Sequence, residues 1–411
     1  MLLACPVSRV PRIYFLFVLK IGFLCCFRAC GVQNLYKWVN FIVFSPAEGG
    51  GKHKIKVNAG DAARSHKNIA IWINLCYNKR IRRERVIQLY PLTFDPIYKE
   101  MVWGGSQLAD LFGRTLPSPH TGESWDVSCR PDEMSVVSNG TDKGKTLEAV
   151  IRQDPEGVLG KRMAGRETFG LLIKLISAND NLSVQVHPDD SYARRVEQKP
   201  FGKTEMWIVL DAPKDAYLIV GLKDGVTQDV FRRAIETGEV EDCLEKVPAK
   251  PGDVFYIPAG LIHALTSGIV VAEVQQNSDL TYRVFDYNRV GLDGKPRPLH
   301  VEKAIDVSDF TGALSKEPVV GVVTEQDGNT WVDYTSSELF ALWKVDVKER
   351  LTEQSDPDRY FIYTCLEGSC EVRGGTDSIR IGKGDSCFIP AALGTFKIEG
   401  ACVLLKTYMQ G

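Results

Sequence analysis

Residues 182–190, LSVQVHPDD, place an amide and an imidazole on the same face of a predicted strand. Apolar residues alternate with polar ones, as expected for a strand with two different faces, and the polar set is Ser183, Gln185 and His187. If the apolar face packs on the core, the polar face points at water. However, Gln-x-His on one strand face can also direct two ligands at a single metal ion.

Two further segments carry side chains that could complete a metal site. Glu205 follows His187 by 18 residues in GKTEMW, and His263 ends the stretch GDVFYIPAGLIH. Neighbouring strands of a barrel can point an amide oxygen, two imidazoles and a carboxylate inward, and such a ligand set suits zinc. A single histidine is usually structural or exposed, but four residues in register favour a metal. We therefore expect the polar face of the first strand to point inward.

The elements that would position these residues are mainly short strands. From Leu89 onward, segments such as YLIVGL, DVFYIPA, IVVAEVQQ and YFIYTCLEG have the length and β-branched content of strands. One helix is predicted in VTQDVFRRAIETG, from its polar start to Gly238. The pattern predicts a β-sandwich or barrel with helical insertions.

An internal repeat indicates two related β modules. KPGDVFYIPAGLIHAL, at 250–265, resembles GKGDSCFIPAALGTF, at 382–396, with a constant offset of 132 residues. Each copy reads as a Gly-Asp turn, a strand, a bend that contains proline and a further strand. His263 aligns with Thr395, so we expect the second module to have lost the function of that histidine.

These motifs resemble known families at two levels. The stretch from Gly252 to His263 fits the cupin pattern G-x5-P-x-G-x2-H, and Gln185-x-His187 with Glu205 is similar to the first cupin motif, with Gln replacing its first His. Furthermore, YPLTFDPIYKEMVWGG, GESWDVS, SVQVHPDD, GKTEMW and NSDLTYRVFDYNR together resemble type I, zinc-dependent mannose-6-phosphate isomerases of the short bacterial form. This resemblance runs from about residue 89 to the end.

The family resemblance implies a fold, a cofactor and a ligand set. The fold would be mainly β, with tandem cupin (jelly-roll β-barrel) modules and helical insertions. One Zn²⁺ per chain would be bound by the family's ligands, which fall on Gln185, His187, Glu205 and His263. The second module would be free of metal.

The resemblance also implies the reversible isomerisation of mannose 6-phosphate and fructose 6-phosphate through a cis-enediol(ate). That reaction needs a Lewis acid or fixed dipole for the developing oxyanion, a base and cations for the phosphate. Zinc can meet the first need. The family's catalytic arginine falls on Arg283 in SDLTYR, and Lys203 and Glu273 also match family motifs. Either Lys203 or Glu273 could be the base.

Other residues are candidates for the substrate pocket. Ser183 lies on the opening strand, Lys174 interrupts the apolar segment LLIKLIS, and Trp103 lies in a matching N-terminal motif. Trp103, together with Glu123 and Trp125, is also typical of residues that pack or form a pocket wall.

Alternative interpretations remain for residues and for function. Arg283 could be a surface strand residue, and Lys203 could pair with a carboxylate for stability. Glu273 lies in an apolar strand, where an unpaired carboxylate is costly, which favours a role at the site. The protein could also be another metal-dependent cupin enzyme, such as an iron dioxygenase, but Gln185 fits such a site poorly. A non-catalytic sugar-phosphate-binding protein would be expected to lose the metal ligands or the arginine.

Charge and cysteine content bound the remaining possibilities. The net charge of -2 gives no signal for nucleic acid, but residues 1–85 hold 15 Lys/Arg against 3 Asp/Glu. Their apolar run, IYFLFVLKIGFLCCF, is shorter than the roughly 20 residues that a membrane span requires. A signal, an anchor or a targeting extension is possible, but we favour sequence outside the functional protein and no membrane association. The 11 cysteines lack a pairing pattern, which predicts a reducing cytoplasm.

We therefore expect three segments. Residues 1–85 are a basic N-terminal extension, residues 86–325 a catalytic metal-binding cupin domain with a helical insertion near 226–246, and residues 326–411 a second, metal-free cupin-like domain. The predicted partner is a small sugar phosphate, and the sequence carries no signal for an oligomeric state.

Overall fold

The structure is a computed structural model that describes residues 42–43, 56–57, 88–166 and 168–410. The chain divides into two units, Met1–Val86 and Ile87–Gly411. In the first unit, β1 (Ile42–Val43) pairs with β2 (Lys56–Val57) in antiparallel register. The rest of the predicted N-terminal extension, including its apolar run, lies outside the described residues. Among the helices of the described residues, none is long and apolar enough to cross a membrane.

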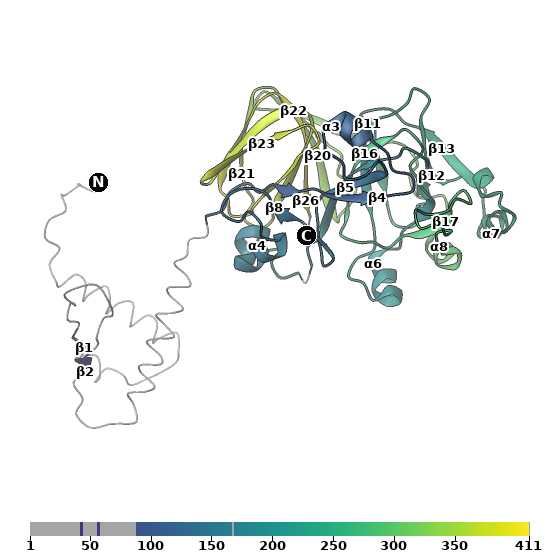
Figure 1. Cartoon of the computed structure of the whole chain (residues 1–411), viewed down its shortest axis with the longest axis horizontal. Helices are drawn as coiled ribbons and strands as arrows, with labels where there is room; N and C mark the ends of the chain where they lie inside the picture. Colours follow the sequence, from purple (N-terminus) through teal and green to yellow (C-terminus); the bar gives the residue numbers. More distant parts are fainter. Residues whose placement is uncertain (1–41, 44–55, 58–87, 167, 411) are drawn as a thin grey trace. The chain divides into compact units, whose positions relative to one another are not determined.

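Two antiparallel sheets form the first module of the second unit (Figure 1). Sheet A has the order β14 (Val254–Ile257), β11 (Glu205–Asp211), β16 (Val270–Gln276), β9 (Leu171–Ser177), β5 (Thr121–Val127) and β4 (Ile97–Glu100). Sheet B has the order β13 (Leu244–Pro248), β12 (Tyr217–Leu222), β15 (His263–Ala264), β10 (Val184–Val186) and β17 (Tyr282–Phe285).

Period-two alternation gives sheet A two different faces. Its outer face, with Met206 and Val274, belongs to a large apolar core. Its inner face, with Trp207 and Val271, packs in a separate cluster with Val220 of sheet B. Strand side chains alternate between faces, so every second residue of β11 and β16 points into the space between the two sheets.

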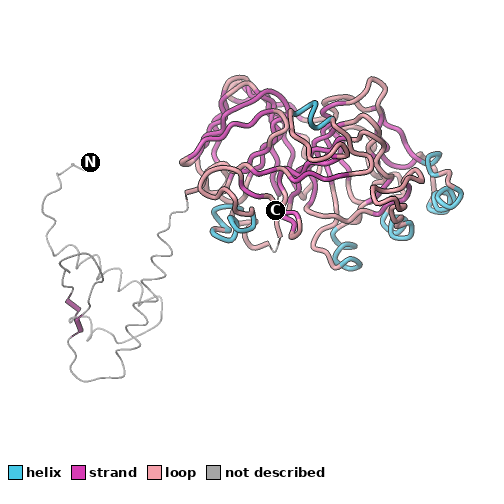
Figure 2. Tube along the Cα trace, viewed as in Figure 1, coloured by secondary structure: helices cyan, strands magenta, loops and turns pink. Residues whose placement is uncertain are grey.

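Helices lie outside the strand layers (Figure 2). They are α3 (Gln107–Phe112), α4 (Leu147–Gln153), α5 (Pro155–Leu159), α6 (Asp190–Tyr192), the π-helix η2 (Ala193–Glu197), α7 (Gln228–Thr237), the 3-10 helix η3 (Val240–Cys243) and α8 (Val301–Val307). Helix α7 confirms the helix expected from the sequence. The Thr227 hydroxyl accepts a hydrogen bond from Val230 N–H at its start, and Gly238 takes a left-handed φ of 80° at its end.

Sheet C forms the second module. Its strand order is β18 (Val322–Gln326), β19 (Asn329–Asp333), β20 (Phe340–Val347), β26 (Cys402–Met409), β22 (Phe361–Gly374), β25 (Thr395–Glu399) and β21 (Arg350–Gln354), with β23 (Asp377–Gly382) and β24 (Ser386–Ile389) also paired to β22. Short pairs complete the unit: β3 (Phe94–Asp95) with β8 (Val136–Val137), and β6 (Cys129–Arg130) with β7 (Glu133–Met134). The prediction of a mainly β fold with helical insertions is confirmed.

The two modules share a core. Met206 and Val274 of sheet A belong to one apolar cluster with Ile362 and Phe388 of sheet C. The segment before β3 ties them further, because Leu92 and Phe388 exchange two backbone hydrogen bonds of 2.9 and 2.8 Å. We therefore expect the modules to unfold together.

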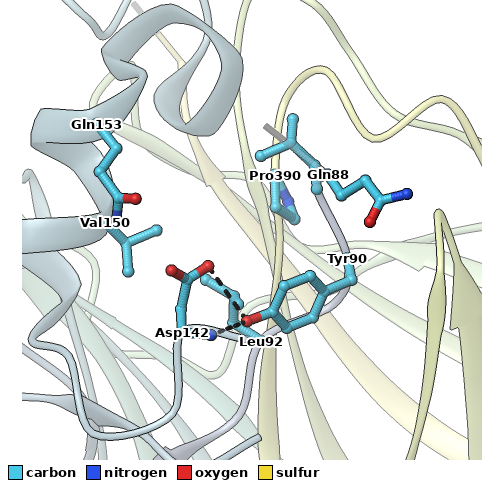
Figure 3. A pocket seen from close by; sticks show the side chains of 8 residues that line it. Gln88, Tyr90, Leu92, Asp142, Val150, Gln153 and Pro390 are labelled. Atoms are coloured by element: carbon cyan, nitrogen blue, oxygen red, sulfur yellow. Dashed lines mark hydrogen bonds between the residues drawn. The ribbon is translucent and has the colours of Figure 1, made fainter. Parts of the chain in front are cut away.

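Near this contact lies a hollow of about 10 Å³, enough for roughly one water molecule. The Tyr90 hydroxyl closes one side of it, because it bonds both the backbone N–H and the carboxylate of Asp142 (Figure 3). A hollow of this size cannot hold a sugar phosphate.

Candidate metal centre

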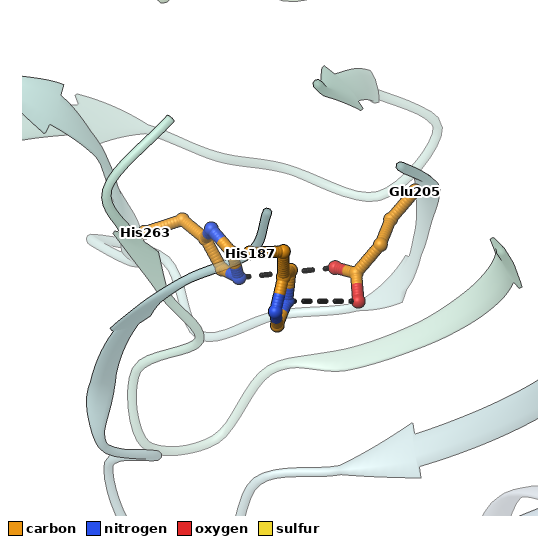
Figure 4. Close-up of side chains that lie close together, drawn as sticks. All are labelled: His187, Glu205 and His263. Carbon is orange, nitrogen blue, oxygen red and sulfur yellow. Dashed lines mark ion pairs between the residues drawn. The ribbon is translucent and has the colours of Figure 1, made fainter. Parts of the chain in front are cut away.

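Three metal-binding side chains meet between the sheets (Figure 4). His187 directly follows β10, His263 begins β15 beside it in sheet B, and Glu205 begins β11 in sheet A. Glu205 Oε1 lies 3.2 Å from His187 Nε2, and Glu205 Oε2 lies 3.8 Å from His263 Nε2. One ligand atom from each residue falls within 4.8 Å of the others. The polar face of the opening strand points inward, as predicted.

The bonding of these side chains fits a metal ion. His187 Nε2 and both oxygens of Glu205 are buried without a hydrogen-bond partner in the described structure. The other ring nitrogens are occupied, since Nδ1 of His187 and of His263 lies 2.8 Å from a backbone carbonyl, that of Leu280 and of Leu261 respectively. Such contacts favour the tautomer with the proton on Nδ1 and leave the Nε2 lone pair free.

The protonation states also fit a metal ion. Burial lowers the pKa of His187 to about 3, assisted by the nearby Lys203 cation, and burial also lowers the pKa of His263. Burial alone would raise the pKa of Glu205, but the Lys203 cation holds it well below its usual range. Two neutral imidazoles and one carboxylate are the forms in which these groups bind metals.

Lys203 and Gln185 lie at the edge of this cluster. Lys203 Nζ forms an ion pair with Glu205 Oε1 at 2.6 Å, but the angle between the ammonium and the carboxylate is not that of a hydrogen bond. Gln185 is opposite His263 in the strand register, with its Nε2 3.4 Å from His263 Nε2. Its Oε1 accepts from the Ser183 hydroxyl at 3.4 Å. Rotating the Gln185 amide by 180° would point its oxygen at the cluster. The Ser183 hydroxyl can donate or accept a hydrogen bond, so it can bond the amide in either orientation.

A row of polar side chains crosses the inner face of sheet A. Glu273 is opposite Lys174 on β9 and opposite Trp207 on β11. Lys174 Nζ lies 3.0 Å from Glu273 Oε1 and 3.6 Å from Glu123, and Trp207 Nε1 donates to Glu273 Oε2 at 2.7 Å. Trp207 follows Glu205 by two positions, so the row shares its face with the metal centre.

Burial acts differently on the two charges of this row. It would lower the pKa of Lys174, but Glu123 and Glu273 outweigh it, so the pKa is raised and the ammonium stays charged. Burial raises the pKa of Glu273, and the negative charge of Glu205 adds to this effect. A carboxylate with a raised pKa beside a metal centre is suited to proton transfer.

Arg283 approaches the centre from β17. It is opposite Gln185 in the strand register, and its Nε donates to the Ser183 hydroxyl at 3.2 Å. Its Nη1 donates to the Pro298 carbonyl at 2.8 Å. Burial lowers the pKa of Arg283, and the nearby Arg297 cation lowers it further. The residue is therefore half-buried beside the metal ligands.

The structure brings most of the predicted site residues together, but adds others. Trp103 is buried in the apolar cluster between the sheets, which also contains Trp207. Trp207 was not among the predicted site residues, and Glu123 was predicted only to pack or to form a pocket wall. Their positions on the strands could have identified both residues. Trp207 lies two positions after Glu205, and Glu123 lies two positions before Trp125, so each shares a strand face with a predicted residue.

Comparisons with known proteins agree with these motifs. Residues 92–209 match the model for the type I phosphomannose isomerase catalytic domain, and residues 330–409 match that for the mannose-6-phosphate isomerase cupin domain. The mannose-6-phosphate isomerase ManA of Bacillus subtilis is 38% identical over 78% of this chain and 99% of its own length. The mannose-6-phosphate isomerase of Streptococcus mutans is 34% identical over 77% of this chain and 98% of its own length.

Solved structures agree as well. The crystal structure of mannose 6-phosphate isomerase from Bacillus subtilis matches with a TM-score of 0.71 and 34% identity, over 78% of this chain and 99% of that one. A mutant phosphomannose isomerase from Salmonella typhimurium matches with a TM-score of 0.62 and 16% identity, over 78% of this chain and 100% of that one. The second match bears on the fold alone.

Proposed function

The chain belongs to the family of type I phosphomannose isomerases, and we propose that it interconverts mannose 6-phosphate and fructose 6-phosphate at the cluster of His187, Glu205 and His263. The observation that carries this proposal is the set of convergent, buried ligand atoms that have no hydrogen-bond partner in the described structure. The two family motifs supply these residues, and the first belongs to the part that matches the catalytic-domain model.

The metal in this proposal is one Zn²⁺ per chain. Gln185, His187, Glu205 and His263 would hold it, because nitrogen and oxygen ligands of this kind suit zinc. Bound zinc supplies a Lewis acid that polarises the substrate carbonyl and stabilises the charge that develops on its oxygen.

The base in this proposal is Glu273. An ammonium that pairs with Glu205 already carries its proton, which leaves Lys203 poorly placed to accept another. Glu273 is an acceptor with a raised pKa, and the Trp207 N–H holds one of its oxygens. The carboxylate would take the proton from one substrate carbon and return it to the adjacent carbon.

Arg283 would stabilise the enediolate oxygen. Its guanidinium stays charged at any working pH and offers a planar fork of donors, and it lies opposite Gln185 on the neighbouring strand. Ser183 accepts from Arg283 and donates to Gln185, so it would hold both side chains in place. Lys174 would keep Glu273 oriented, and Trp103 would form part of the pocket wall.

A coupled assay for fructose 6-phosphate formation from mannose 6-phosphate tests this function, run with and without a chelator. Elemental analysis of the same sample should give one zinc per chain. Activity should disappear with the metal and return when zinc is added back. Stoichiometric iron with oxygen consumption would instead indicate a dioxygenase, and sugar-phosphate binding without turnover would indicate a binding protein.

The proposed domain limits are 1–85, 86–325 and 326–411, with catalysis in the middle segment. A chain that starts at Val86 should be as active as the full chain, because the matched relatives align over nearly their whole length with 78% of this chain. Aggregation or loss of activity in the truncated chain would contradict this, and recovery of the full chain in a membrane fraction would favour an anchor in residues 1–85. We propose a cytoplasmic location, since the six cysteines of the described structure, all from Cys129 onward, are free thiols.

A further inference from the structure

A single loop connects two of the proposed metal ligands, which lie in different sheets. Residues 188–204 run from His187, directly after β10 of sheet B, to Glu205, the first residue of β11 in sheet A. Glu205 Oε1 lies only 3.2 Å from His187 Nε2, although the loop between them contains both α6 and η2. The contacts at the two ends of the loop therefore decide how closely these ligands converge.

The backbone of the loop meets itself beside the ligands. Lys203 N–H donates to the Pro188 carbonyl at 2.9 Å, so the first and the second-last residue of the loop are hydrogen-bonded. Gly202 lies next to this contact, and a Cβ at this position would clash with the Pro188 carbonyl oxygen. The close approach of the two ends requires glycine here.

Two side chains fasten the same ends. Asp190 Oδ1 accepts hydrogen bonds from the Gly202 N–H at 2.8 Å and from Gln276 Nε2 at 2.9 Å. Gln276, the last residue of β16, accepts from the Thr204 N–H through Oε1 at 3.0 Å, and its own N–H donates to the Thr204 carbonyl at 3.1 Å. The carboxylate and the amide thus link the residue after the HP dipeptide of the first motif to the residue before Glu205.

The Gln276 amide has one orientation that satisfies these contacts. Its nitrogen faces the Asp190 carboxylate, which only accepts, and its oxygen faces the Thr204 N–H, which only donates. A flipped amide would place oxygen against carboxylate and nitrogen against N–H. Because Gln276 is only 2% exposed, water cannot easily replace either bond. The contacts therefore fix both the distance and the direction of the loop ends.

The position of the Glu205 carboxylate depends strongly on this backbone. Both of its oxygens lack a hydrogen-bond partner among the described residues. Its ion-pair partner, Lys203, belongs to the same end of the loop. The two histidine rings, in contrast, are held by carbonyls of other segments. A shift of residues 202–204 would therefore move the carboxylate relative to the imidazoles.

We propose that Asp190 and Gln276 are positioning residues, which raise the zinc affinity of the centre by holding Glu205 close to His187. Ligands that are already in place bind with a smaller loss of conformational entropy. This inference rests on the zinc centre of the proposed function and deepens it, because it assigns a role to two residues outside the proposed ligand set.

Zinc titration of the metal-free, full-length protein in competition with a chromogenic chelator tests the proposal. Asp190→Ala and Gln276→Leu should each raise the Kd for zinc by about tenfold or more, the scale seen when residues that orient metal ligands are removed. The double variant should be little worse than either single variant, because both side chains act through one network. Asp190→Asn should keep the wild-type Kd, since its amide oxygen can still accept from both donors.

Asp189→Ala is the matched control. Asp189 is the adjacent carboxylate, and its Oδ1 accepts from the Tyr192 N–H at 2.7 Å at the exposed start of α6. Its replacement removes the same charge from the same loop but leaves the contact between Asp190 and Gln276 intact, so the Kd for zinc should not change. If Asp189→Ala or Asp190→Asn raised the Kd as much as Asp190→Ala, the effect would be one of charge and the proposal would be wrong.

Thermal unfolding of the metal-free variants separates positioning from a purely structural role. A variant that melts at a lower temperature but keeps the wild-type Kd for zinc would show that the network stabilises only the fold, and would overturn the proposal. If Gln276→Leu does not fold, Asp190→Ala decides alone. The Asp190 side chain is 27% exposed, so its removal leaves no closed cavity.

The zinc titration contains no sugar, so it separates this inference from the proposed activity. If zinc affinity depends on Asp190 and Gln276 but the wild-type protein does not isomerise mannose 6-phosphate, the activity is wrong and the positioning role stands. If the wild-type protein is an isomerase and the Asp190→Ala protein keeps the wild-type Kd for zinc, the activity stands and the positioning role is wrong.

Discussion

The two β modules share a strand arrangement but differ at the position of Glu205, the carboxylate of the proposed metal centre. In the first module, Glu205 of β11 is opposite Ile257 of β14. In the second, Phe361 of β22 is opposite Ile389 of β24, and Ile257 and Ile389 are related by the 132-residue offset of the repeat. Phe361 therefore occupies the position of Glu205, and a phenyl ring cannot bind a metal.

The neighbouring strand shows a reversal of charge. Glu273 of β16 is opposite Trp207, and Lys406 of β26 is opposite Tyr363 in the corresponding pair. The carboxylate that we propose as the base is thus an ammonium in the second module. Two carboxylates of the first module have no counterpart in the second.

The interior of the second module is filled by its own cation. Lys406 Nζ lies 4.1 Å from the Phe361 ring centroid and 5.4 Å from that of Trp331. It forms an ion pair of 2.5 Å with Glu353, which also bonds the Tyr363 hydroxyl. Cation–π contacts and a partly buried ion pair can stabilise such a lysine. Side chains of the second module therefore fill the positions that correspond to Glu205 and Glu273 in the first.

The strand pair that presents the histidine also differs. Gln185 is opposite His263, and Gln354 is opposite Thr395 at the equivalent place. Thr395 Oγ1 donates to Gln354 Oε1 at 2.8 Å, and both side chains are exposed. The amide is retained in both modules, so it does not account for the difference between them. Burial together with the imidazole and carboxylate distinguishes the first module.

The largest effect should come from replacing His263 of the first module with alanine. The matched control replaces the equivalent residue of the second module, Thr395, with alanine. His263→Ala removes a ligand from a buried centre, so it should lose both the metal and the activity. Thr395→Ala should keep the wild-type metal content and kcat. Elemental analysis and the coupled assay measure both, with circular dichroism to check folding. A His263→Ala protein with stoichiometric zinc would show that the metal is bound elsewhere.

A smaller loss is expected for Arg283, whose proposed contact forms mainly in the transition state. Arg283→Ala should keep zinc and fold, but lose at least about 10²-fold in kcat, the scale seen when one oxyanion donor is removed. kcat and kcat/KM should fall together. Arg283→Lys should restore little, because a point charge lacks the fork geometry.

Arg350→Ala, at an exposed position of β21 in the second module, is the control for that measurement and should be neutral. An increase in KM alone for Arg283→Ala would make Arg283 a ground-state contact.

In the second module, Lys406→Met should affect stability rather than chemistry. It leaves Glu353 largely buried and unpaired, so the free energy of unfolding should fall by about 3–5 kcal/mol. Urea unfolding measures this, with Lys397→Met on the exposed face of β25 as a neutral control. The metal content at room temperature should be unchanged. If Lys406→Met were neutral in stability, the ion pair would not be what holds this interior together.

Alternation within a strand and the motif resemblance were sufficient to single out the residues that we propose as metal ligands, Gln185, His187, Glu205 and His263. The repeat likewise predicted that Thr395 replaces His263. The exchange of Glu273 for Lys406 could not be predicted in this way, since it depends on the register between strands that lie far apart in the chain. That Arg289 and Arg297 both bond Asp286 could not be predicted either, for a different reason. They meet through Asp286 in an irregular connection, where no period links residue type to direction.

A further prediction concerns the pH dependence of the first module. As the base, Glu273 must be deprotonated, so kcat/KM should fall as the pH falls through its pKa, which burial and Glu205 raise above the ordinary value. Trp207→Phe removes a donor that favours the charged carboxylate. This acid limb should therefore move upward by about one pH unit. A limb that stays in place would favour Lys203 as the base.

The smallest effect is expected when the second module receives the histidine that it lacks. Thr395→His restores one imidazole, but Phe361 still stands in the place of Glu205, and Lys406 adds a positive charge nearby. A divalent cation would have only this imidazole and the exposed Gln354 amide as neutral ligands, and it would face an unfavourable ammonium. The variant should therefore still bind one zinc per chain. Elemental analysis and competition with a chromogenic chelator measure the stoichiometry. A second zinc in Thr395→His would show that the carboxylate is dispensable, and that the difference between the modules depends on the histidine alone.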